Sequence, residues 1–305
     1  MLDFSALIKT LQTAFPALEL REREPMSAHT SFRIGGPARL MAVPATEEEA
    51  IGAAAAAKKL GIPVIWMGNG SNLLVSDDGV AALVIKTAER MNQISLSGEG
   101  ELTAGSGVLL SRLAVFACEH GLTGLEFAHG IPGTLGGAVT MNAGAYDGEM
   151  SQVLRSVRHV SEDGTVEELP AEKLKLGYRT SIYSDGKRLI LLAKLALKPG
   201  NRDTIRAKMD ELRERRTSKQ PLEYPSAGSM FKRPPGHFAG ALIDQCGLRG
   251  FTVGGAQVSE KHAGFVINRG GATCRDVLEL VQAVQRTVEE RTGVRLEMEV
   301  KTLGL

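Results

Sequence analysis

Residues 121–148 contain eight glycines and few charges, and this segment constrains the fold more than any other part of the chain. Glycine loses more conformational freedom on folding than other residues do, so a dense run of glycines needs a compensating reason. Small uncharged residues suit a wall that lies flat against a large planar ligand and its diphosphate. The segment therefore predicts an ordered loop that passes through a binding site, with a purely structural loop as the alternative.

The first glycine-rich loop, Met67 to Asn72, comes earlier in the chain, and the glycine segment within 121–148 is the second. Its glycines allow backbone N–H groups to approach a phosphate, and its Ser and Asn side chains add hydrogen-bond donors. A Rossmann fingerprint needs a third glycine and a helix directly afterwards, but Leu73 stands at that position and an extended run follows. The loop can thus hold a dinucleotide in a manner other than the Rossmann one, and a structural hairpin is the alternative.

Composition excludes several classes of protein. Of the 305 residues 43% are hydrophobic, and 36 basic residues balance 35 acidic ones, so we expect no nucleic-acid partner. The sequence contains no stretch of 18 consecutive apolar residues, so we expect no membrane-spanning helix. The three cysteines are an odd number without a CxxC pair, and the histidines lack metal-ligand spacing. We expect a cytoplasmic protein of two or three domains without a metal site.

Helix and strand patterns organise the rest of the chain. An amphipathic helix leads, an extended run over 32–43 follows, Thr46 and Glu49 form a helix-capping signature, and Gly61 ends that helix. With the apolar strand 62–67 this makes a βαβ pattern, typical of α/β architecture. Further helices are expected over 108–119, 203–219, 238–245 and 274–291, and strands over 73–75, 81–86, between 153 and 197, and over 294–300. Three segments result: 1–85, 86–200 and 201–305.

Five motifs then occur in a fixed order: GNGSNLLVSDDG, GLTGLEFAHGIPGTLGGAVTMNAGAYDGEM, YRTSIY, SAGSMFKRPPGHFAGALIDQCGLRG and LEMEV. Together they resemble the UDP-N-acetylenolpyruvoylglucosamine reductases, the MurB family, across nearly the whole chain. The first two motifs indicate the wider FAD-binding superfamily shared with vanillyl-alcohol-type oxidases, and the last three are specific to the reductases. The short stretch between Ser184 and Pro199 resembles the compact subtype that lacks an extra substrate-covering loop.

The resemblance implies a fold and a reaction. The fold is the FAD-binding fold of the vanillyl-alcohol-oxidase-like (PCMH-type) class, α+β and α/β, in two subdomains over 1–85 and 86–200. A C-terminal α+β substrate-binding domain over 201–305 completes it. The reaction is reduction of the enolpyruvyl ether of UDP-GlcNAc to UDP-N-acetylmuramate in peptidoglycan synthesis, with NADPH as hydride donor and noncovalent FAD. The oligomeric state stays open, with a monomer favoured.

Three residues match the family's catalytic positions, Arg179, Ser229 and Glu299. Arg179 would bind the substrate carboxylate and stabilise the enolate. Ser229 would donate the proton to the enolate carbon. Glu299 would help stabilise the enolate in its protonated form, which requires a pKa raised by burial. Glu297, one strand repeat away, is the alternative for that carboxyl group.

The matched motifs also assign binding residues. The residues expected to bind FAD are Arg33, Ile34, Gly35, Met67, Gly68, Asn69, Gly70, Ser71, Asn72, Leu73, Gly130, Ile131, Pro132, Gly133, Thr134, Gly136, Gly137, Ala138, Asn142, Ala143, Gly144, Ala145 and Arg216. The residues expected to bind the UDP-sugar are Tyr178, Arg179, Lys219, Gly228, Ser229, Lys232, Arg233 and Glu299. Arg233 stands where the family often has Asn. We therefore expect position 233 to contact the diphosphate of the substrate through the guanidinium, in place of recognition through an amide side chain.

Two other functions fit part of the sequence. An FAD oxidase of the same binding fold would act on a small hydroxylated substrate, and His129 would then be a candidate for covalent flavin attachment. A non-catalytic protein that binds a nucleotide diphosphate would use the glycine loops alone. Neither explains the last three motifs together, so the sequence favours the reductase.

Overall fold

The computed structural model describes residues 2–161 and 163–305. Close contacts group the chain into two units. Unit 1 comprises Met1–Glu22, Leu40–Asn69 and Ala82–Arg215, and unit 2 comprises Arg23–Arg39, Gly70–Ala81 and Arg216–Leu305. Each unit is therefore assembled from separate stretches of chain, and the contiguous division at residues 85 and 200 stays a prediction.

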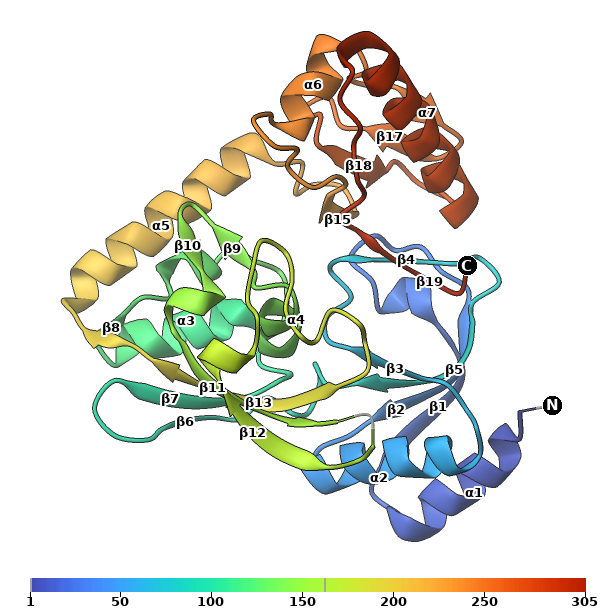
Figure 1. The fold of residues 1–305 in the computed structure, drawn as a ribbon, viewed down its shortest axis with the longest axis vertical. Helices are drawn as coiled ribbons and strands as arrows, with labels where there is room; N and C mark the ends of the chain where they lie inside the picture. The colour runs from blue at the N-terminus through green and yellow to red at the C-terminus, as the bar shows by residue number, and fades with distance from the viewer. Residues whose placement is uncertain (1, 162) are drawn as a thin grey trace. The chain divides into compact units, whose positions relative to one another are not determined.

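The first sheet has the strand order β1-β2-β5-β3 (Figure 1). Its strands are β1 (Glu19–Pro25), β2 (Pro37–Val43), β5 (Val80–Lys86) and β3 (Val64–Met67). In unit 1, helices α1 (Phe4–Ala14) and α2 (Glu47–Lys59) pack on this sheet through one apolar cluster. That cluster includes Leu7, Leu11, Leu40, Ala53, Ala57 and Leu83, all fully buried.

The sequence signature at Thr46 is confirmed, because its side chain accepts a hydrogen bond from the Glu49 N–H at 3.2 Å. The helix ends before Gly61, whose φ of 66° lies in the left-handed region. The expected strand, helix and strand are all present. However, β3 pairs in parallel with β5 and not with β2. The run over 32–43 is a strand from Pro37 onward.

The second sheet belongs wholly to unit 1 and is antiparallel, in the order β12-β11-β13-β7-β6. Its strands are β6 (Ile94–Leu96), β7 (Glu101–Gly105), β11 (Leu154–Val160), β12 (Val166–Pro170) and β13 (Leu189–Ala196). Helices α3 (Leu110–Glu119) and α4 (Leu135–Thr140) share its core, in which Leu113, Leu135, Val157 and Leu195 are fully buried. Burial alternates along β7, as expected of a strand with one face against the core.

Short elements connect the sheets. They are η1 (Met26–Ala28), β8 (Leu122–Thr123), η2 (Glu126–Ala128), β9 (Gly144–Ala145), β10 (Gly148–Glu149), η3 (Met150–Gln152), η4 (Ala171–Lys173) and β14 (Lys198–Pro199). The charged helix expected over 203–219 is present as α5 (Arg202–Lys219). Its buried side chains are Ile205, Met209 and Leu212, so the basic and acidic side chains occupy the rest of its surface.

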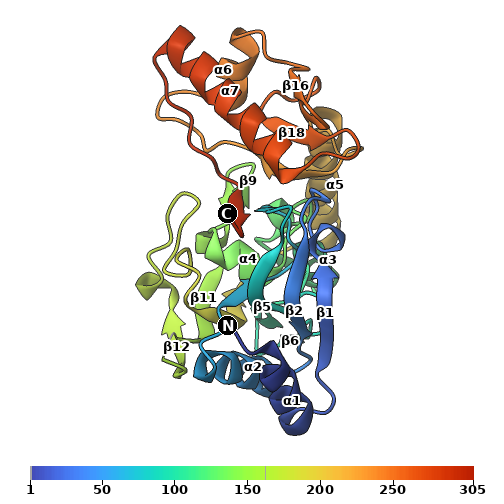
Figure 2. The ribbon, with the colours of Figure 1, turned by 90° about the vertical axis from the view of Figure 1, so that its right-hand side faces the viewer.

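Unit 2 has a small antiparallel sheet covered by two helices (Figure 2). The strand order is β15-β18-β17-β16, with β15 (Ser226–Ser229), β16 (Thr252–Val253), β17 (Ala256–Val258) and β18 (Phe265–Asn268). The helices are α6 (Ala239–Gln245) and α7 (Cys274–Thr292), and a capping box of Thr273 and Asp276 starts α7. A separate parallel pair joins β4 (Leu73–Val75) to β19 (Lys301–Leu303).

The prediction of a strand over 294–300 is wrong in its range. These residues form one isolated bridge, from Met298 to Phe231, and the strand proper begins at Lys301. Leu296 and Val300 are nevertheless buried in the core of unit 2. The alternating pattern reports burial of one side of an extended segment, whereas a strand also needs a continuous neighbour to pair with.

Three expectations from composition concern disulfides, membranes and metals. The three cysteines are buried thiols without a disulfide. Within 2–161 and 163–305, no helix has both the length and the apolar character needed to cross a membrane. Across these same ranges, no group of His, Cys, Asp and Glu side chains could hold a metal ion.

An ion-pair cluster at the edge of unit 1 sets an acid-sensitive contribution to stability. Glu89 accepts from Arg21 Nη2 at 2.8 Å and from Lys86 Nζ at 2.7 Å. Chiefly through the hydrogen bond from Arg21, these cations lower the pKa of Glu89 from 4.5 to about 2. The Glu89 side chain is 35% exposed, so solvent screens much of the attraction.

We expect Glu89→Gln to lower the free energy of unfolding at pH 7 by about 1 kcal/mol after screening. Because the folded pKa is depressed, the contribution is present above about pH 4.5 and is lost as the pH falls towards 2. Urea unfolding of both proteins between pH 7 and pH 3 measures the difference, with exposed Glu172→Gln as control. A difference that stays constant over this range would contradict the assignment.

Candidate active site

The two glycine-rich loops meet in unit 1. Asn69 Nδ2 donates to the Pro132 carbonyl oxygen at 2.7 Å, and this bond ties the first loop to the second. Gly68 lies so close to Thr134 that a Cβ at Gly68 would overlap Thr134 Oγ1. Glycine is therefore required at position 68 by close approach of the two loops, and the structure brings together these parts of the predicted FAD site.

Two hydroxyl groups in this region are buried without a hydrogen-bond partner among the described residues, Ser106 Oγ and Thr134 Oγ1. Ser106 is 2% exposed and Thr134 is 1% exposed. A Cβ at Gly136 would stand 2.9 Å from Ser106 Cβ, so this glycine too permits close packing. Unsatisfied buried hydroxyls are costly in a native fold and mark sites of strain or of ligand contact. The donors and the close-packed glycines fit a cofactor that carries a diphosphate.

Ser106 was not among the residues predicted from the sequence. It stands between Gly105 and Gly107, and this Gly-Ser-Gly triplet is the one signal that could have drawn attention to it. His129 Nδ1 is likewise buried without a partner in the described part of the chain. Burial, followed by the positive charges of Arg213 and Arg206, lowers the pKa of His129, which favours the neutral imidazole.

Arg179 sits on a tight turn of unit 1. The backbones of Gly177 and Thr180 pair across the turn, and Arg179 has a left-handed φ of 55°. The guanidinium donates to the Gly144 carbonyl oxygen at 3.4 Å and lies 5.3 Å from the centre of the Tyr178 ring. The turn thus brings Tyr178 and Arg179 to the glycine segment that was expected to bind FAD.

The segments that carry Ser229 and Glu299 lie next to each other in unit 2. The Glu299 N–H donates to the Met230 carbonyl oxygen at 2.9 Å, next to the bridge between Phe231 and Met298. Asn72 Nδ2 donates to the Glu299 carbonyl oxygen at 3.2 Å. The end of the first glycine loop therefore lies beside the segment that carries Glu299.

Glu297 and Glu299 occupy different environments. The Glu297 side chain is 72% exposed and forms an ion pair with Lys232, which lowers the pKa of Glu297. Glu299 is 9% exposed. A protonated carboxyl group needs burial, so the burial of Glu299 favours it over Glu297 for the predicted role. The ion pair with Glu297 also engages the side chain of Lys232, a predicted substrate-binding residue.

The remaining predicted residues fall into both units. Unit 1 holds Met67, Gly68, Asn69, the residues from 130 to 145, Tyr178 and Arg179. Unit 2 holds Arg33, Ile34, Gly35, Gly70, Ser71, Asn72, Leu73, Arg216, Lys219, Gly228, Ser229, Lys232, Arg233 and Glu299. Ile34 is buried, Arg216 Nε donates to Gln220 at 2.8 Å, and the Arg233 guanidinium lies 4.0 Å from the centre of the exposed Phe238 ring.

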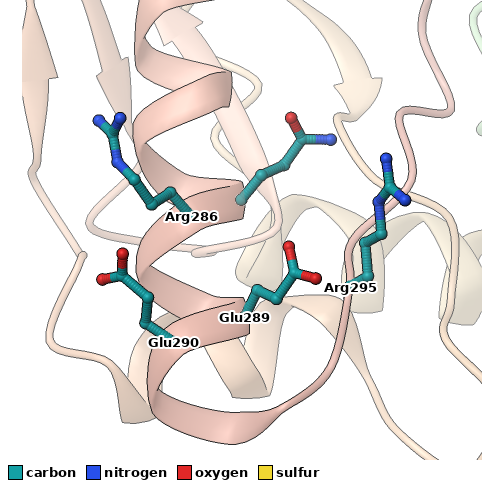
Figure 3. A pocket seen from close by; sticks show the side chains of 5 residues that line it. Arg286, Glu289, Glu290 and Arg295 are labelled. Atoms are coloured by element: carbon teal, nitrogen blue, oxygen red, sulfur yellow. The ribbon is translucent and has the colours of Figure 1, made fainter.

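A shallow hollow on α7 does not coincide with these residues. It has a volume of about 360 Å³ and is lined by Gln285, Arg286, Glu289, Glu290 and Arg295 (Figure 3). Charged side chains of both signs line it, which is typical of a solvated surface. The motif residues, and not this hollow, define the candidate site.

Comparison with known protein families identifies both parts of the chain. The profile described as "FAD binding domain" matches residues 38–170. The profile described as "UDP-N-acetylenolpyruvoylglucosamine reductase, C-terminal domain" matches residues 220–303. With the paired glycine loops and their buried hydroxyls, these matches define an FAD-dependent oxidoreductase with the PCMH-type FAD-binding fold.

Full-length relatives narrow the class to one family. The UDP-N-acetylenolpyruvoylglucosamine reductase of Clostridium perfringens (strain SM101 / Type A) is 46% identical over 304 residues, 100% of this chain and 99% of the relative. The reductase of Clostridioides difficile (strain 630) is 48% identical over 286 residues, 94% of each chain. The crystal structure of the reductase (MurB) from Thermus caldophilus is 38% identical, with a TM-score of 0.79 over 94% of this chain and 98% of that one. The chain belongs to the UDP-N-acetylenolpyruvoylglucosamine reductase family.

The family, the fold class, the class of enzyme and the cofactors expected from the motifs are thereby confirmed. The protein is an FAD-dependent oxidoreductase of peptidoglycan synthesis. The roles of individual residues stay predictions.

We expect Gly68→Ala to weaken FAD binding about tenfold or more, because the added methyl group would overlap Thr134 and push the two loops apart. Titration of the apoprotein with FAD, followed by flavin fluorescence, measures the dissociation constant. The double variant Gly68→Ala/Thr134→Ala is compared with Thr134→Ala alone, because the Thr134 hydroxyl is itself expected to contact FAD. Without the overlapping oxygen, the change at Gly68 should cost less FAD affinity than it does in the unaltered protein, and an equal cost in both backgrounds would show that the overlap is not the cause.

Proposed function

We propose that the chain reduces UDP-N-acetyl-3-O-(1-carboxyvinyl)-glucosamine to UDP-N-acetylmuramate with NADPH. The observation that carries the proposal is the pairing of the segments that carry Ser229 and Glu299, through the Glu299-to-Met230 hydrogen bond and the bridge beside it. FAD, when bound, would supply hydride transfer between NADPH and the terminal alkene carbon of the substrate. The side chains of the protein stabilise the negative charge that forms on the substrate and donate the proton to its carbon.

Addition of hydride at the terminal carbon leaves an enolate that extends into the substrate carboxylate. Arg179 binds this carboxylate through charge-assisted hydrogen bonds, which strengthen as negative charge builds up. Glu299, buried and protonated, donates a further hydrogen bond to the enolate. These two residues act on charge that exists chiefly in the transition state, so they affect the rate more than the binding of substrate.

Ser229 donates its hydroxyl proton to the carbon next to the carboxylate and so completes the lactyl ether. Ser229 is exposed, so its alkoxide regains a proton from solvent. A serine hydroxyl is a weak acid in water and needs a cation or a relaying water nearby. Lys232 and Lys219 are the cations that we assign to this part of unit 2, and Lys232 is held by its ion pair with Glu297.

Further residues bind the two nucleotides. We assign Tyr178, Gly228 and Arg233 to the UDP-sugar and Arg216 to the flavin or the substrate diphosphate. The glycine loops and the hydroxyls of Ser106 and Thr134 hold FAD without a covalent bond. We also propose a cytoplasmic location, which suits three reduced thiols, and a monomeric state.

We expect Ser229→Ala to leave flavin reduction by NADPH within about twofold and to slow flavin reoxidation by substrate by about 100-fold or more. Anaerobic stopped-flow absorbance of the flavin measures both half-reactions, with the unaltered protein bleaching with NADPH and recovering with the UDP-sugar. Equal loss in both half-reactions would remove Ser229 from the donor role. Recovery of the unaltered protein with oxygen but not with the UDP-sugar would indicate an oxidase, and a protein that takes up no FAD would refute the cofactor.

Glu299→Gln should retain more activity than Glu299→Ala, because an amide can still donate a hydrogen bond to the enolate whereas a methyl group cannot. We expect losses of about tenfold and about 1000-fold in kcat. Glu297→Ala is the matched control: it removes an exposed carboxylate and its pair with Lys232. A larger loss for Glu297→Ala than for Glu299→Ala would reassign the catalytic carboxyl group to Glu297.

A further inference from the structure

Asn142 lies in the second glycine segment but is almost fully enclosed by protein. It is 1% exposed and has a left-handed φ of 42°, a conformation that Asn tolerates better than most residues. The sequence assigned it to FAD because it follows the glycines. Its side chain is instead committed to two backbone groups of the protein.

Both ends of the Asn142 amide are used. Nδ2 donates to the Gly177 carbonyl oxygen at 3.2 Å, and Oδ1 accepts from the Ser151 N–H at 2.9 Å. The Gly177 carbonyl is also the group that accepts from the Thr180 N–H at 3.2 Å and closes the turn. Asn142 therefore binds the same carbonyl group that closes the turn carrying Arg179.

Other bonds hold the same turn to the same segment. Ser181 Oγ and Ser184 Oγ both donate to the Thr140 carbonyl oxygen, at 2.8 and 3.2 Å. Beyond them, the buried Tyr183 hydroxyl bonds to His159 Nδ1 at 3.1 Å and anchors the end of the motif to β11. These bonds hold the residues that follow the turn, and the Asn142 amide holds Gly177, the residue that begins it.

We infer that Asn142 is a positioning residue that sets the orientation of Arg179. The inference rests on the proposed role of Arg179 in binding the substrate carboxylate. Arg179 pays a conformational cost for its left-handed backbone, so it needs neighbours that hold the turn closed. Loss of the bond to Gly177 frees the turn, and misplacement of the guanidinium by about 1 Å can cost about 100-fold in rate.

Asn142→Asp is the sharpest variant. It keeps the acceptor for Ser151 and the left-handed backbone preference, but replaces the donor with an oxygen that faces the Gly177 carbonyl. Asn142→Gly also keeps the backbone conformation and removes both bonds. The control is Asn92→Asp, since Asn92 makes the same amide-to-carbonyl bond, to Glu89 at 3.2 Å, in a segment without a proposed site residue.

For both Asn142 variants we expect flavin reoxidation by the UDP-sugar to slow about tenfold or more, with a raised substrate KM. The FAD dissociation constant and flavin reduction by NADPH should stay within about twofold, as should every quantity for Asn92→Asp. Equal losses in FAD affinity and in reoxidation would show that Asn142 contacts the cofactor, and would overturn the inference. A lowered Tm with an unchanged reoxidation rate would reduce Asn142 to a structural residue, which would overturn it as well.

A double-mutant cycle with Arg179→Ala separates the inference from the proposed function. If Asn142 acts through Arg179, Asn142→Asp should change reoxidation by less than about twofold once Arg179 is absent. Additive losses would overturn the inference and leave the role of Arg179 intact. If Arg179→Ala alone leaves reoxidation unchanged, the proposed role of Arg179 fails, and the inference fails with it.

Discussion

The close contact, within unit 1, of Gly68 and Asn69 with the second glycine-rich loop is the constraint on which the predicted cofactor site depends. Gly68 approaches Thr134 so closely that no side chain fits between them, and Asn69 fastens the loops through the Pro132 carbonyl. Glycine is costly in conformational entropy, and here it lets the backbone at Gly68 and Gly136 pack closely against the side chains of Thr134 and Ser106. The buried hydroxyls of Ser106 and Thr134 lie in the packed region that results, where a diphosphate can meet donors that the protein itself leaves unsatisfied.

Backbone hydrogen bonds, more than side-chain pairs, bring the chemical groups of each unit to their places. In unit 2 the Asn72 amide and the Met230 carbonyl both bind the backbone of Glu299, which sets Glu299 beside Ser229 and the end of the first loop. In unit 1 the Gly177 carbonyl closes the turn that carries Arg179 and receives the Asn142 amide. Such bonds fix the position of a residue through its backbone, independently of the contacts that its own side chain makes.

Much of the fold could be predicted because local patterns dictate it. The cap at Thr46, the turn at Gly61 and the apolar spacing of α7 act within a few residues, and each appears in the structure where the sequence indicates it. Pairing could not be predicted in the same way. The segment from 294 to 300 alternates like a strand, yet it makes a single bridge, and β3 pairs with β5 rather than with the strand before its helix. Neighbours in a sheet are chosen by the whole fold, and no local pattern records them.

By itself the sequence determined the family, the fold class and the cofactors, because these follow from ordered motifs whose residue types have to suit FAD and the UDP-sugar. The tertiary structure decided the environment of each side chain. Glu297 is an exposed partner of Lys232 while Glu299 is buried, although the two are alike in a one-dimensional pattern. Ser106 becomes a donor beside the glycine loops, and Asn142 turns inward to hold the Arg179 turn. Burial and hydrogen-bond partners depend on residues far away in the chain, and therefore only the folded arrangement assigns them.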